Sequence, residues 1–74
     1  MAKRPPINNR IRELRKAHGG MTQIELADAI GVTRQTVIAI EQNRYSPSLE
    51  SAFRIARVFN AALEEVFSWS AGED

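Results

Sequence analysis

The sequence QIELADAIGVTRQTVIAIEQ, residues 23–42, decides the fold of this 74-residue chain. Two short segments in it carry apolar residues at helical spacing, and only Gly31 and Val32 separate them. Gly31 can adopt the left-handed conformation of a sharp turn without a Cβ penalty. Ala27 is small enough to let the two helix backbones approach closely. Two helices joined so tightly must cross steeply, so the stretch predicts a helix-turn-helix.

Capping residues outside and inside this stretch divide the chain into five helical segments. The first runs from an N-cap at Asn8 or Asn9 to His18, where Gly19–Gly20 ends it. Thr22 and Glu25 form a capping-box pattern, and Thr33 caps the next helix, which continues through Gln42. The fourth helix starts at Pro47–Ser48 and stops at Asn60, and a last turn or two holds Leu63, Val66 and Phe67.

The expected inner faces follow the helical period. They comprise Ile11 and Leu14; Ile24, Leu26, Ala27 and Ile30; Thr33, Val37 and Ile40; and Leu49, Ala52, Phe53, Ala56 and Phe59. The fold class is therefore all-α, a compact five-helix domain over residues 1–74, with flexible ends at 1–6 and 71–74. A short strand from Ile7 pairing with Phe67–Trp69 is an open addition to this arrangement.

Composition excludes several classes of function. The chain has no cysteine and a single histidine, His18, so neither disulfides nor a metal site is expected. No apolar run approaches the ~20 residues of a membrane span, so we expect a cytoplasmic protein without membrane contact. Glu64 and Glu65 diverge on a helix, the serines lack a base, and no Gly-rich phosphate loop is present. We therefore expect no enzyme, no cofactor and no small-molecule effector.

Charge is unevenly distributed although the net charge is only +1. Residues 1–21 contain six basic residues and one acidic residue, whereas residues 45–74 contain two basic and five acidic residues. A basic front of this kind is typical of a polyanion-binding surface, but a solvated first helix would look the same. Charge alone does not decide between these two interpretations.

The spaced residues from Asn9 to Phe67 resemble the phage repressor and Cro (Xre) family of DNA-binding helix-turn-helix domains. The likeness lies in the Thr22-Gln23 opening with Leu26-Ala27, the TRQT of residues 33–36 and the NRYSPSLE of residues 43–50. It is closest to small single-domain repressors that end in Phe-x-Trp, here Phe67-Ser68-Trp69. The resemblance implies a repressor-like fold whose third helix, the recognition helix, reads double-stranded DNA.

The outward face of that helix supplies the candidate base contacts. Arg34 can donate a bidentate pair of hydrogen bonds to guanine, and Gln35 can pair with adenine. Thr36, Ile38 and Ala39 can touch a thymine methyl, although Ile38 is equally plausible as a tolerated surface residue. The resemblance gives base contacts to Arg34, Gln35, Thr36 and Ala39.

Other positions suit the DNA backbone. Gln23 lies in the first turn of its helix, where free N–H groups favour an anion, and the resemblance assigns it a phosphate contact. Asn43 and Arg44 resemble the family's loop after the recognition helix, with Asn where Gly is usual. The expected phosphate contacts are Gln23, Thr33, Asn43, Arg44 and Arg10; Arg12 is a further possibility, or is simply solvated.

The resemblance also implies two structural features. Arg15 and Glu41 match a pair that ties the first helix to the third. An apolar end formed by Leu63, Val66, Phe67 and Trp69 matches a surface through which similar proteins form homodimers. The alternative is that these four residues complete the core of the monomer.

These features predict a dimeric, sequence-specific repressor that binds a pseudo-palindromic operator through the major groove. Two subunits would occupy half-sites about one turn apart, roughly 10–10.5 bp centre to centre. The alternative is an antitoxin-type module that binds a protein partner and also its own promoter, because a fold does not fix a function.

Overall fold

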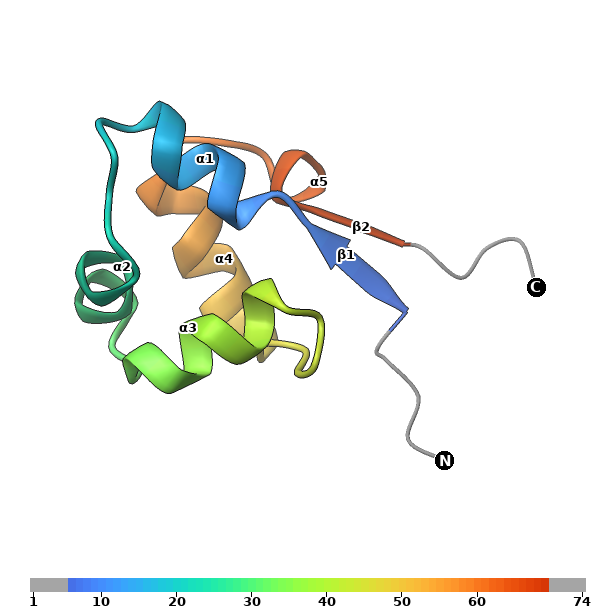
Figure 1. Cartoon of the computed structure of the whole chain (residues 1–74). Helices are drawn as coiled ribbons and strands as arrows, with labels where there is room; N and C mark the ends of the chain where they lie inside the picture. Colours follow the sequence, from blue (N-terminus) through green and yellow to red (C-terminus); the bar gives the residue numbers. More distant parts are fainter. Residues whose placement is uncertain (1–5, 70–74) are drawn as a thin grey trace.

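The computed structural model describes residues 6–69, which form five helices and one two-stranded sheet (Figure 1). The elements in chain order are β1 (Ile7–Asn9), α1 (Ile11–Ala17), α2 (Gln23–Ile30), α3 (Arg34–Glu41), α4 (Leu49–Val58), α5 (Leu63–Val66) and β2 (Phe67–Trp69). The mostly helical, five-helix fold is confirmed, and so is the open strand pairing. The flexible ends expected at 1–6 and 71–74 lie outside the described residues, except for Pro6.

The caps that the sequence predicts are present at three helices. At α2, the Thr22 hydroxyl accepts a hydrogen bond from the backbone N–H of Glu25, and the Glu25 carboxylate accepts one from the N–H of Thr22. Thr33 caps α3 and Ser48 caps α4 in the same way through their hydroxyls. These bonds satisfy helix N–H groups that have no partner inside the helix, so they fix where each helix begins.

Residues with positive φ end the helices. Gly31 closes α2 at φ 77°, where its N–H and that of Val32 both donate to the carbonyl of Ala27. Asn60, the predicted stop of α4, has φ 52°, and the N–H of Ala61 donates to the carbonyl of Ala56. This is the hydrogen bond of a Schellman motif, which consumes otherwise unpaired carbonyls.

The start of α1 differs from the prediction. The helix begins at Ile11, with Arg10 as its N-cap, because residues 7–9 pair with β2 instead. In this antiparallel pair Ile7 lies opposite Trp69, Asn8 opposite Ser68 and Asn9 opposite Phe67. The Asn9 side-chain oxygen Oδ1 still accepts from the backbone N–H of Ile11 at 3.1 Å, so Asn9 serves the helix terminus from within the strand.

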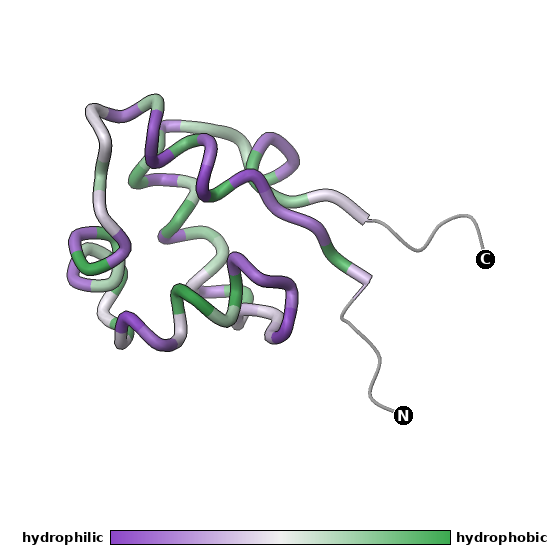
Figure 2. Tube along the Cα trace, in the orientation of Figure 1, coloured by the Kyte–Doolittle hydropathy of each residue, from purple (hydrophilic) through white to green (hydrophobic). Residues whose placement is uncertain are grey.

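A single apolar core lies between the helices. Its buried members are Ile11, Leu26, Ala27, Ile30, Val37, Ile40, Ala52, Ile55, Ala56, Phe59 and Val66. Leu14 and Val32 are half-buried against it. Figure 2 shows that α3 is hydrophilic at its two ends and apolar between them.

Four expected core positions were wrong. Ile24 is 55% exposed, and Leu49, Phe53 and Thr33 are exposed as well. On α4 the buried row is Ala52, Ile55, Ala56 and Phe59, which has the same spacing as a row begun at Leu49. Both rows satisfy the helical period, so the period alone could not choose the face. Thr33 is exposed because its hydroxyl caps α3 at the helix end.

The two isoleucines of α2 provide a matched test of this core. Ile30→Ala should lower the free energy of unfolding by about 2–5 kcal/mol, because it leaves a cavity at a buried site. Ile24→Ala should change it by less than about 0.5 kcal/mol, because that side chain is largely in solvent. Urea unfolding followed by circular dichroism measures both. Equal losses for the two variants would contradict this assignment of the inner face.

Candidate nucleic-acid interface

The α2–α3 pair forms the predicted helix-turn-helix. Ala27 is buried where the helices meet, and the turn passes through Gly31 in the left-handed region. A side chain at Gly31 would be strained at this φ and would meet the Arg54 guanidinium at 3.5 Å. The turn therefore depends on this glycine, and it sets α3 across the surface of the molecule (Figure 1).

The predicted base-contact residues of α3 lie on the side of the helix away from the core and on its flanks. Val37 and Ile40 face the core, whereas Arg34 and Gln35 are exposed at the start of the helix. Thr36, Ile38 and Ala39 are half-buried on the same helix. The Thr36 and Thr33 hydroxyls lie 3.1 Å apart in a hydrogen bond.

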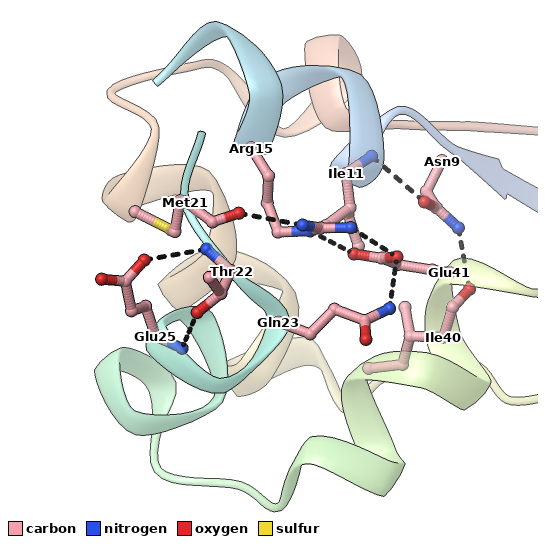
Figure 3. A network of polar contacts seen from close by, with 9 residues as sticks. All are labelled: Asn9, Ile11, Arg15, Met21, Thr22, Gln23, Glu25, Ile40 and Glu41. Atoms are coloured by element: carbon pink, nitrogen blue, oxygen red, sulfur yellow. Dashed lines mark hydrogen bonds and ion pairs between the residues drawn. The ribbon is translucent and has the colours of Figure 1, made fainter. Parts of the chain in front are cut away.

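The Glu41 carboxylate at the end of α3 joins three helices (Figure 3). Arg15 of α1 donates to it twice, from Nε at 2.7 Å and from Nη2 at 3.1 Å. Gln23 of α2 donates to it from Nε2 at 3.1 Å, and a third Arg15 nitrogen donates to the carbonyl of Met21. The Arg15 and Glu41 side chains are only 12% and 7% exposed. The structure thus places the predicted pair together and adds Gln23 to it.

Beside this network lies a basic hollow of about 740 Å³. Its charged lining residues are Arg12, Arg15, Lys16, Arg34 and Glu41, drawn from α1 and α3, and the first turn of α2 adds Gln23 and Ile24. Arg15 and Glu41 pair with each other, so the hollow has an excess of positive charge. Lys16 was not singled out from the sequence. The recognisable pattern was its spacing four residues after Arg12, which places both on one side of α1.

Arg10 does not line this hollow. Its guanidinium forms an exposed ion pair with Glu13, with Nε and Oε1 3.0 Å apart. Its backbone N–H donates to the carbonyl of Val66 at 2.8 Å, so the residue also joins the start of α1 to α5.

The loop after α3 contains the predicted pair Asn43 and Arg44. Asn43 has φ 59°, and the N–H of Arg44 donates to the carbonyl of Ala39, which again forms a Schellman motif. Asn therefore fills the left-handed position where Gly is usual. The Arg44 guanidinium donates to the Gln42 side chain at 2.8 Å, while the Asn43 amide contacts Asn8 and Asn9.

The apolar end of the chain divides between core and surface. Val66 is 1% exposed and belongs to the core, whereas Leu63 and Phe67 are half-buried and Trp69 is 66% exposed. Two adjoining grooves of about 280 and 230 Å³ share Ile7, Leu63 and Phe67 in their walls. The larger groove extends to Leu49 and Ala52, and the smaller one to Trp69.

Within residues 6–69, the histidine and glutamate side chains that were weighed above as metal-binding or catalytic groups make ordinary structural contacts. The His18 ring packs edge-on against Phe59 at 5.1 Å between centroids. The Glu65 carboxylate accepts from the N–H of Ala62 at the start of α5. No cluster of three His, Cys, Asp or Glu side chains is found in this range that could hold a metal ion. None of its helices has the length and apolar character needed to cross a membrane.

A family model described as helix-turn-helix matches residues 11–66, which span α1 through α5. The chain belongs to this family. It is 51% identical over 61 residues to an "Uncharacterized HTH-type transcriptional regulator" of Archaeoglobus fulgidus, covering 82% of this chain and 86% of that protein. A protein of Methanothermobacter thermautotrophicus with the same description is 57% identical over 58 residues, covering 77% of this chain and 83% of that protein.

Two further likenesses bear on function and fold. The "Cryptic phage CTXphi transcriptional repressor RstR" of Vibrio cholerae is 33% identical over 62 residues, which are 84% of this chain and 55% of that protein. A crystal structure of a protein from Bacteroides fragilis superimposes with a TM-score of 0.72 at 24% identity, covering 84% of this chain and 98% of that one. This second likeness confirms the fold.

The Glu41 network predicts a large loss of stability when one partner is removed. Glu41→Ala should lower the free energy of unfolding by about 3–5 kcal/mol, because it leaves the Arg15 guanidinium buried without its carboxylate. Glu13→Ala is the matched control, since it breaks an exposed arginine–glutamate pair and should cost less than about 1 kcal/mol. Urea unfolding of both variants measures the difference. Similar losses would show that the network does not hold the helices together.

Proposed function

We propose that this chain is a homodimeric repressor that binds a pseudo-palindromic DNA operator, with α3 in the major groove of each half-site. The coarser function follows from the family and the named relatives: it is a transcriptional regulator with a helix-turn-helix domain that binds double-stranded DNA. The observation that carries the finer proposal is the exposed Arg34–Gln35 start of α3, which adjoins the basic hollow.

Direct base contacts are assigned to the start and outward side of α3. Arg34 lines the hollow and can extend toward guanine O6 and N7, and Gln35 can pair with adenine N6 and N7. Thr36 and Ala39 contribute methyl groups for thymine, and Ile38 contributes a larger apolar contact. The hydrogen bond between Thr36 and Thr33 favours the methyl role, because it engages the Thr36 hydroxyl.

Backbone phosphates are assigned to the hollow and to the termini of α2 and α3. Gln23 uses one amide hydrogen on Glu41, which leaves the second for a phosphate oxygen. Arg12 and Lys16 supply positive charge in the same hollow. Thr33 and Arg44 flank the two ends of α3 and complete the set. Arg10 and Asn43 are weaker candidates, because Arg10 lies outside the hollow and the Asn43 amide has other partners.

Dimerisation is assigned to the apolar surface formed by Ile7, Leu63, Phe67 and Trp69. The two grooves share Ile7, Leu63 and Phe67, and Trp69, which is 66% exposed, lines the smaller one, so they form an exposed apolar patch of the kind that marks an interface. Val66 is omitted from this surface because its side chain is already buried within the protomer. One recognition helix contacts only a few base pairs, so pairing two subunits supplies the specificity that one lacks.

A selection from random duplexes, followed by gel-shift measurements on the winning sequence, tests the base assignments. Arg34→Ala should weaken binding to the selected duplex by about 1–3 kcal/mol and relax the preference at one base pair in each half-site. Gln23→Ala should instead weaken binding to selected and unrelated duplexes alike, because a phosphate contact carries no sequence information.

The two variants control for each other in this experiment. Arg34 would be only a phosphate contact if its replacement reduced binding to every duplex equally. A change in base preference on replacing Gln23 would contradict its backbone role. Selection that yields no enriched sequence would overturn sequence-specific binding as a whole.

The dimer is tested by sedimentation equilibrium at micromolar concentration. The wild-type chain should sediment at twice the 8.3 kDa mass of the monomer, and Trp69→Ala should shift it toward the monomer. Phe53→Ala is the control, because it removes another exposed aromatic side chain outside the walls of the two grooves. A wild-type monomer that also fails to pair on the selected duplex would refute the dimer and favour a different protein partner at this surface.

A further inference from the structure

Three asparagine amides connect strand β1 to the end of α3. Asn9 Nδ2 donates to the carbonyl of Ile40 at 2.8 Å and to the Asn43 side-chain oxygen at 3.1 Å. Asn43 Nδ2 donates in turn to the Asn8 side-chain oxygen at 2.7 Å. We call Asn8, Asn9 and Asn43 the amide junction. Each of these hydrogen bonds joins residues more than 30 positions apart in the chain, so the junction is a tertiary link.

The junction is tightly built. Asn9 and Asn43 are half-buried, and the pocket that both of them line has a volume of only about 10 Å³. The Asn9 oxygen accepts from the N–H of Ile11, so both ends of its amide are engaged. A side-chain amide can donate and accept at once, as Asn9 and Asn43 both do here.

The junction joins two surfaces that have different proposed roles. Asn8 and Asn9 lie on β1, directly after Ile7, which lines both apolar grooves of the proposed dimer surface. Ile40 and Asn43 lie at the end of α3, the proposed recognition helix. The Glu41 network ties α3 to α1 and α2, whereas the amide junction ties it to the sheet.

We propose that Asn8, Asn9 and Asn43 are positioning residues that fix the recognition helix relative to the dimer surface and thereby set the half-site spacing that the dimer accepts. This inference rests on the proposed dimeric function. It assigns the three amides a role in spacing, which is separate from base or phosphate contact.

The dimensions of α3 show why a link at its end matters. An eight-residue helix is about 12 Å long, so a tilt of about 15° about its end displaces the other end by about 3 Å. Successive base pairs are about 3.4 Å apart. A tilt of that size between the sheet and the helices held by the Glu41 network would therefore shift Arg34 and Gln35 by nearly one base-pair step relative to the dimer surface, without altering the contacts within a half-site.

The test compares binding to duplexes that differ only in spacing. They carry two selected half-sites whose centres are separated by about 8 to 13 bp, in single-base steps around the expected one-turn distance. A further duplex carries one half-site. Asn8→Ala removes the outer hydrogen bond of the junction, and Asn43→Gly removes both side-chain contacts of Asn43 while keeping a residue suited to positive φ. Asn60→Gly is the matched control, because Asn60 also ends a helix at positive φ but lies outside the junction.

Wild type and Asn60→Gly should prefer one spacing sharply. In Asn8→Ala, the ratio of affinities between the best and the neighbouring spacings should fall about two- to tenfold, as expected for the loss of one hydrogen bond. Its affinity for the single half-site should stay unchanged. In Asn43→Gly the same ratio should fall, whatever happens to overall affinity, because a lost phosphate contact would weaken every spacing equally. Thermal unfolding by circular dichroism establishes that each variant is folded.

Two outcomes would overturn the junction's role. One is an unchanged spacing ratio in both folded variants while wild type remains selective. The other is an equal loss of affinity for the single half-site and for every spacing. A wild-type protein that binds the single half-site but shows no spacing preference would refute the dimeric function itself, and the junction's role with it. Failure of the two proposals is therefore distinguishable.

Discussion

Glu41 is the residue on which the arrangement of the helices depends. Its carboxylate accepts two hydrogen bonds from Arg15 of α1 and one from Gln23 of α2, while its own backbone belongs to α3. A carboxylate that is nearly buried needs these donors, because an unpaired charge in the interior is expensive. The three helices can therefore move apart only if this charge is exposed or left unpaired. The basic hollow and the outward face of α3 both take their shape from the same contact.

The hydrogen bonds of the Glu41 network constrain the orientation of the helices, which the apolar core does not. Leu26, Val37 and Ile40 supply stabilising burial, but burial is non-directional and tolerates a rotated or shifted helix. A buried ion pair adds little net stability over well-packed apolar residues. The bidentate guanidinium of Arg15 instead constrains how α3 is oriented, and we infer that this orientation is its main contribution. The same constraint holds Gln23 at the start of α2, where a phosphate is expected.

Local signals were predictable from the sequence, whereas among the tertiary contacts only the pairing of Ile7 with Phe67–Trp69 was suggested by it, as an open addition. The capping box at Thr22, the cap at Thr33 and the turn at Gly31 each depend on residues within a few positions, so their geometry follows from the local sequence. The start of α1 was misplaced because β1 pairs with residues about 60 positions away. The ion pair of Arg15 was implied by a resemblance. The bond of Gln23 to the same carboxylate requires the three-dimensional arrangement, as does the position of Lys16 in the hollow. The base-contact residues of α3 remain predictions.

The net charge of +1 is a weak guide to DNA binding because the relevant charge is local. A phosphate in the hollow would meet Arg12, Lys16 and Arg34 at close range, and the one acidic side chain there, Glu41, is already neutralised by Arg15. Exposed charges beyond roughly 8 Å are largely screened at physiological ionic strength. Acidic residues farther than this from the hollow therefore oppose such binding far less than the sum of charges suggests. Segregation of charge, maintained by the Glu41 contacts that hold α1 to α2 and α3, makes a nearly neutral chain suitable for a polyanion.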